Sequence, residues 1–169
     1  IIVFDVLRRY LESQKIPVEF IQNFTDVDDK IIDRARQEKI SAMDLADKYT
    51  KNYFDDFDGL NVKRASIYPK ATEHIEDMQN LISDLIDKKY AYVTKNGVYF
   101  SVSKFIEYGK LSKKNIDDLV SGARVTVDEE KNDPIDFALW KFSESEPFWD
   151  SPWGRGRPGW HIECSAMSL

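Results

Sequence analysis

Cys164 is the only cysteine in this chain of 169 residues, so thiol chemistry here depends on that side chain. A thiol can act as a nucleophile, as a metal ligand or as a small apolar group in a core. His161 stands three residues earlier, but residues 160–164 resemble the start of a strand. Side chains three positions apart on a strand point to opposite faces, so we do not expect a local Cys–His nucleophile.

Two interpretations of Cys164 remain, a metal ligand and a small buried apolar side chain. Zinc needs three or four ligands, so partners of Cys164 would come from His74, His161, carboxylates or sequence outside the chain. The run His161-Ile162-Glu163 is similar to the H-x-E motif of zinc deaminases. Those enzymes also need a later P-C-x-x-C motif, which this sequence lacks, so we reject that interpretation.

Two further groups of residues have side chains suited to ligands. The run GRGR at residues 154–157 offers backbone N–H groups and guanidiniums to a phosphate, with a solvated basic loop as the alternative. Three glycines and two prolines within residues 152–159 predict no regular structure there. Asp26, Asp28 and Asp29 suggest a cation site, although acidic residues also favour the first turn of a helix.

The elements at the start of the chain place Thr25 and Asp26 at a suggestive point. Apolar residues recur at helical spacing over residues 1–13, and residues 18–22 form a short run typical of a strand. A helix that leads into a mostly apolar strand is half of a βαβ unit. Ligands of open α/β sheets bind at the carboxyl ends of the strands, where Thr25 and Asp26 would lie.

Helices and a hairpin fill the middle of the chain. Ser41 and Asp44 are spaced like a capping box, which predicts a helix from residue 41 to a stop at Gly59. A stripe of period 3.6 predicts a second helix over residues 72–86. Residues 92–102 then read as a hairpin that turns at Asn96-Gly97.

The composition predicts a packed globular protein, with 42% apolar and 13% aromatic residues. The net charge of −6 argues against a chain devoted wholly to phosphate binding, although it leaves room for a local basic patch. No apolar run approaches the roughly 20 residues that span a bilayer, and nothing resembles a signal peptide. We expect a piece of a longer protein, because the chain starts without Met. A lone cysteine is consistent with a reducing, cytoplasmic setting.

Three stretches together resemble cysteinyl-tRNA synthetase, a class I aminoacyl-tRNA synthetase. They are FIQNFTDVDDKII at residues 20–32, YGKLS at 108–112 with the run at 122–141, and SPWGRGRPGWHIECSAM at 151–167. The match runs nearly end to end, and the last motif is the most specific.

The resemblance implies an α/β, Rossmann-type catalytic domain with an inserted connective region of helices and a β-hairpin. The division would be residues 1–43 as catalytic domain, 44–119 as the insertion, and 120–169 as the return with a zinc-ligand strand. The implied reaction activates cysteine with ATP and Mg and transfers it to tRNA-Cys. The oligomeric state is left open by the residues, with a monomer as the expectation.

The resemblance also implies roles for three residues: Cys164 as a ligand of the catalytic zinc, Thr25 in the cysteine pocket, and Trp160 beside the substrate. No catalytic residue is assigned within the chain. The family's ATP motifs, His-Ile-Gly-His and Lys-Met-Ser-Lys-Ser, are absent from these 169 residues, so we expect the chain alone to be inactive and to bind zinc weakly at most.

Two other functions are kept as alternatives. The cysteine ligase of mycothiol synthesis shares a similar adenylation site but joins cysteine to an amino sugar and binds no tRNA. A non-catalytic module that binds RNA or a partner protein is the second alternative. Its phosphate contacts would be sought among Lys110, Lys113, Lys114 and Arg124.

Overall fold

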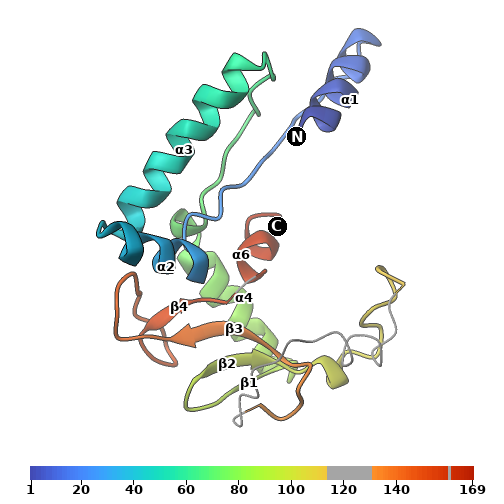
Figure 1. Ribbon diagram of the computed structural model, residues 1–169. Coiled ribbons are helices and arrows are strands. Elements are labelled where there is room, and N and C mark those ends of the chain that lie inside the picture. Colours follow the sequence, from blue (N-terminus) through green and yellow to red (C-terminus); the bar gives the residue numbers. More distant parts are fainter. Residues whose placement is uncertain (114–130, 160) are drawn as a thin grey trace. The chain divides into compact units, whose positions relative to one another are not determined.

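The computed structural model describes residues 1–113, 131–159 and 161–169, shown as a ribbon in Figure 1. Contacts between residues divide the chain into two units, Ile1–His74 and Ile75–Leu169. In the described residues, no helix is long and apolar enough to cross a membrane. The mixed α/β class predicted from sequence is confirmed, whereas the division at residues 43 and 119 stays a prediction.

The first unit contains three α-helices and a short 3-10 helix. They are α1 (Ile2–Ser13), α2 (Asp29–Glu38), α3 (Ala42–Gly59) and η1 (Ala71–Glu73). The predicted capping pair is confirmed, because the Asp44 N–H donates to the Ser41 hydroxyl at 3.0 Å and that hydroxyl donates to the Asp44 carboxylate at 2.7 Å. Side-chain caps of this kind supply acceptors to N–H groups that the first helical turn leaves without partners.

The strand predicted over residues 18–22 is present only as extended backbone with isolated parallel bridges. Ile21 pairs with Ile67 and Phe24 with Lys70, and the Phe24 N–H donates to the Pro69 carbonyl at 2.9 Å. Pro69 has no N–H of its own, which limits a regular ladder at this point. The parallel direction agrees with the predicted βαβ half-unit, and it brings residues 24–26 beside residues 70–72.

Helix α1 is attached to its unit by its charged side. Asp5 and Arg8 are buried, while the apolar residues Val3, Val6, Leu7 and Tyr10 are 50–78% exposed. Asp5 accepts from Arg9 at 2.7 Å and from the Lys63 N–H at 3.0 Å, and Arg8 donates to the Arg64 carbonyl at 2.7 Å. Burial raises the pKa of Asp5. The hydrogen bonds that Asp5 accepts from Arg9 and Lys63, together with the guanidinium charges of Arg8 and Arg9, outweigh burial and leave this pKa below its usual value.

The second unit is built on a four-stranded antiparallel sheet in the order β1-β2-β3-β4. Its elements are α4 (Ile75–Asp87), β1 (Ala91–Val93), β2 (Gly97–Phe100), η2 (Val102–Lys104), β3 (Phe137–Phe142), β4 (Gly156–Pro158) and α6 (Ile162–Ala166). The predicted helix and hairpin are confirmed. Met78 and Ile82 of α4, Val98 of β2 and Trp140 of β3 are wholly buried and form the centre of this unit's core.

Two local predictions in this unit are wrong. The hairpin does not turn on Asn96-Gly97, since the Thr94 N–H donates to the Gly97 carbonyl at 2.8 Å and Lys95-Asn96 occupy the centre. Glycine is needed at position 97 because a Cβ there would overlap the carbonyl oxygen of Trp140. Residues 156–158, predicted to be irregular, pair with β3 instead, because their backbone groups complete the ladder of that strand.

Asp136 joins the hairpin to the segment that leads into β3. It is 2% exposed and accepts from the Val102 N–H at 2.9 Å and from the Tyr92 hydroxyl at 2.7 Å. The Tyr92 oxygen in turn accepts from the Asn132 N–H at 2.9 Å. Burial raises the pKa of Tyr92, and the hydrogen bond to the Asp136 carboxylate raises it further. The bond from the Asn132 N–H lowers it, and the net result is a pKa of about 12.

Alkaline pH should therefore destabilise the second unit through Tyr92. A tyrosine whose pKa is raised on folding stabilises the fold fully below the unfolded value of about 10, and this contribution is lost as pH rises toward 12. In Tyr92→Phe we expect the free energy of unfolding to be lower at neutral pH and to fall less steeply between pH 10 and 12. Urea titrations at several pH values measure this, with the exposed Tyr10→Phe as control. Equal slopes in Tyr92→Phe and wild type would contradict the assignment.

Candidate functional site

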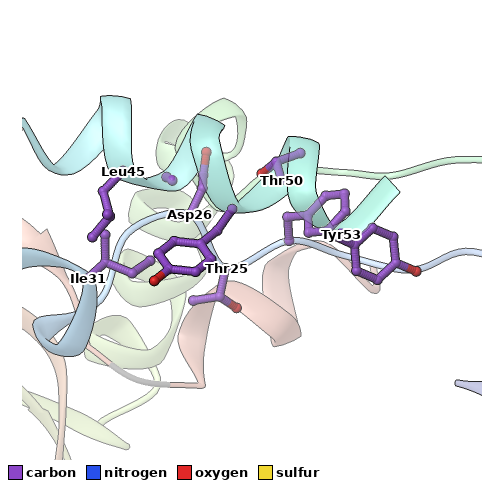
Figure 2. Close-up of a pocket in the computed structure, with 9 residues that line it drawn as sticks. Thr25, Asp26, Ile31, Leu45, Thr50 and Tyr53 are labelled. Carbon is purple, nitrogen blue, oxygen red and sulfur yellow. The ribbon is translucent and has the colours of Figure 1, made fainter. Parts of the chain in front are cut away.

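Thr25 lines a pocket in the first unit, as the predicted position at the end of an extended segment suggested. The pocket has a volume of about 290 Å³ and lies between the loop at residues 24–26, α2 and α3. Figure 2 shows Leu45, Thr50 and Tyr53 on α3 and Thr25 on the loop. Its lining residues are Phe24, Thr25, Asp26, Ile31, Leu45, Ala46, Tyr49, Thr50 and Tyr53.

Aromatic rings hold the walls of this pocket in place. The Phe24 ring meets the Tyr53 ring edge-on at 5.0 Å between centroids and stacks on Tyr68 at 5.3 Å. Burial raises the pKa of the Tyr53 hydroxyl above its usual value. Mostly apolar walls with a few hydroxyls, here Thr25 and Thr50, are typical of sites for small molecules.

The three aspartates near this pocket have structural partners. Asp26 is 5% exposed and accepts from Thr72 twice, from the backbone N–H at 3.0 Å and from the hydroxyl at 2.6 Å. Asp28 caps α2 by accepting from the Lys30 N–H at 2.6 Å, and Asp29 lies in the first helical turn. The structure therefore favours the helix-terminus interpretation for Asp28 and Asp29 over a cation site.

Cys164 lies in the helix α6 (Ile162–Ala166), so the strand predicted at residues 160–164 is wrong over residues 162–164. His161 has a left-handed backbone with φ of 82°, and its carbonyl accepts from the Ser165 N–H at 3.2 Å. Ile162 and Ala166, four residues apart, are both buried. This helical burial outweighs the local strand preference, and the argument that a strand separates His161 from Cys164 no longer applies.

The described residues do not give Cys164 a complete set of metal donors. Its thiol is partly exposed, and thiolate sulfur is a donor that zinc prefers. Over residues 1–113, 131–159 and 161–169, however, no three His, Cys, Asp or Glu side chains lie together as a metal site requires. Within those residues, Cys164 could supply at most one of the ligands that a zinc ion needs.

The GRGR run does not form the phosphate cradle considered from sequence. The Gly154 N–H donates to Ser151, and the Gly156 N–H donates to the Trp149 carbonyl at 3.0 Å. Arg155 is paired with Asp150 at 3.1 Å. Because both glycine N–H groups already donate hydrogen bonds inside the protein, they are not available to a ligand.

Some predicted residues cannot be placed. Trp160, Lys114 and Arg124 lie outside the described residues. No pattern in the sequence predicted that Tyr49 and Tyr53 would line the same pocket as Thr25. Residues four apart on a helix share a face, but no local pattern identifies the loop that this face of α3 covers.

Comparison with known proteins assigns this arrangement to a class. A family model described as tRNA synthetases class I (C) catalytic domain matches residues 1–169. The chain therefore belongs to the catalytic-domain family of class I tRNA synthetases.

Similar proteins bear a more specific name. The cysteine–tRNA ligase of Thermodesulfovibrio yellowstonii is 60% identical over 99% of this chain. The cysteine–tRNA ligases of Caldicellulosiruptor saccharolyticus and Aquifex aeolicus are 59% and 55% identical, over 100% and 99% of the chain. The chain spans 36%, 37% and 34% of the lengths of these three relatives, about a third of each.

Proposed function

We propose that the protein to which this chain belongs is a cysteine–tRNA ligase, which activates cysteine with ATP and Mg and transfers it to tRNA-Cys. The observation that carries the proposal is the 60% identity with a relative of that name across 99% of the chain. The apolar pocket beside Thr25 supports it, because it has the character of a site for a small molecule.

The chain contributes to amino-acid selection through three residues in this proposal. Thr25 offers a hydroxyl to the bound cysteine, and Trp160 lies beside the substrate. Cys164 is one ligand of a zinc ion, and the remaining ligands come from other parts of the longer protein. When bound, the zinc ion prefers the thiolate of cysteine to the hydroxyl of serine. The proposal also includes that the longer protein is a monomer and lies in the cytoplasm.

The similarity of cysteine and serine explains why a zinc ion is needed for selection. They differ by a single atom, and pocket shape separates near-isosteres by only about 10–200-fold. The described part of the chain supplies walls and one sulfur donor, so its task is to bind and position rather than to react. ATP activation then depends on positioning and on stabilising charge, with groups supplied elsewhere in the longer protein.

The full-length protein tests this proposal directly. We expect cysteine-dependent exchange of pyrophosphate into ATP and charging of tRNA-Cys, while the 169-residue chain alone gives no exchange. Serine in place of cysteine and an unrelated tRNA are the controls. Exchange without any charging of tRNA-Cys, together with transfer of cysteine to an amino sugar, would favour the mycothiol-type ligase instead.

A further inference from the structure

The loop that carries Thr25 is fixed on both sides of that residue. On one side the Phe24 N–H donates to the Pro69 carbonyl at 2.9 Å, and the Phe24 carbonyl accepts from the Ala71 N–H at 3.0 Å. On the other side Asp26 accepts twice from Thr72. Both sets of bonds reach the same short segment, residues 69–72, which lies 45 or more residues further along the chain.

The bond between Asp26 and Thr72 is the stronger of these two attachments. Hydrogen bonds to an ionised acceptor are roughly twice as strong as neutral ones, and the 2.6 Å distance from the Thr72 hydroxyl is typical of that class. The carboxylate is 5% exposed, so water competes poorly for it. Figure 2 shows the Thr25 and Asp26 side chains leaving the loop in opposite directions. Fixing Asp26 therefore fixes the direction of Thr25.

We infer that the Asp26–Thr72 pair is a positioning device for amino-acid binding. Its role is to hold the Thr25 hydroxyl at one place in the pocket that Thr25 and Asp26 both line. This inference rests on the proposed function, in which Thr25 contacts the bound cysteine. Because displacement of a positioned group by about 1 Å can cost on the order of 100-fold, loss of this pair acts on cysteine binding first.

Steady-state pyrophosphate exchange with the full-length protein tests the inference. Thr72→Val removes the hydroxyl while keeping the backbone N–H and the shape, and we expect it to raise the KM for cysteine about tenfold with the KM for ATP unchanged. Thr72→Ser keeps the hydroxyl and should restore the wild-type KM for cysteine. Asp26→Asn, which keeps one acceptor, should lie between these two, and it serves if Thr72→Val fails to fold.

A matched control removes a threonine hydroxyl from the other unit. Thr94 uses its hydroxyl within the hairpin, donating to the Gly97 carbonyl at 3.2 Å and accepting from the Asn96 N–H at 3.1 Å. Thr94→Val should therefore lower thermal stability without moving the KM for cysteine. An equal rise in both KM values for Thr72→Val, or no rise in either, would overturn the inference.

The inference and the proposed function fail in different ways. If the wild-type protein shows no cysteine-dependent exchange, the proposed function is wrong. If the wild type is active and Thr25→Val raises the KM for cysteine but Thr72→Val does not, only the positioning role of Asp26 and Thr72 is wrong. If Thr25→Val has no effect in an active wild type, the positioning inference also falls, because the pair then holds nothing that binds substrate.

Discussion

Replacing Cys164 by serine in the full-length protein is expected to lower its bound zinc and to remove most of its preference for cysteine over serine. The substitution exchanges a sulfur donor for a hydroxyl that zinc ligates poorly. Without the metal, discrimination falls back toward the range of about 10–200-fold that pocket shape supplies. Elemental analysis of the purified protein and the ratio of kcat/KM values for the two amino acids in pyrophosphate exchange measure both effects.

A neighbouring serine on the same helix provides the control for this experiment. The Ser165 hydroxyl donates to the His161 carbonyl at 3.1 Å, so Ser165→Ala perturbs α6 without removing a sulfur. It should retain zinc and the preference for cysteine. If Cys164→Ser also retains both, then Cys164 is only a small packed side chain, and the metal-ligand assignment is wrong.

Replacing Trp140 by alanine is expected to be the most destabilising single change in the second unit. Trp140 is wholly buried on β3, where it pairs with Val98 on one side and with Pro158 on the other. Its Nε1–H donates to the Gly154 carbonyl at 3.3 Å. Truncation of a buried tryptophan costs about 3–5 kcal/mol, a large part of the 5–15 kcal/mol that typically stabilises a domain.

Urea unfolding followed by far-ultraviolet circular dichroism measures this loss without relying on tryptophan fluorescence. Trp140→Phe is the matched variant, since it keeps an aromatic ring while losing the donated hydrogen bond, and its loss should be clearly smaller. A change of less than about 1 kcal/mol in Trp140→Ala, the size of an ordinary surface substitution, would show that β2, β3 and β4 do not depend on this side chain.

Local patterns predicted the helices α3 and α4 well. The capping pair at Ser41 and Asp44 and the stripe through Met78 and Ile82 depend on residues three or four positions apart, and α3 and α4 follow them. The strand β4 was missed for the opposite reason. Its glycine and proline residues have little strand preference of their own, and only pairing with β3 makes them extended.

The site was predictable only in part. Thr25 could be placed at the end of an extended segment, and the structure indeed puts it on a pocket. Its supporting contact between Asp26 and Thr72 joins positions 46 residues apart, and no local pattern reports such a pair. Cys164 was identified as the residue of interest but assigned to a strand, because burial of Ile162 and Ala166 on one helical face is a tertiary effect.

The two sides of α1 should respond to added sulfate in opposite ways. The ion pair of Glu12 with Lys63 ties one side to its unit, and dissolved salt screens an attraction of this kind. The other side presents Val3, Val6 and Leu7 to water, and excluded salts such as sulfate strengthen the burial of hydrocarbon. Sulfate would thus loosen this helix from its own unit while making its outer face more adhesive to any apolar surface.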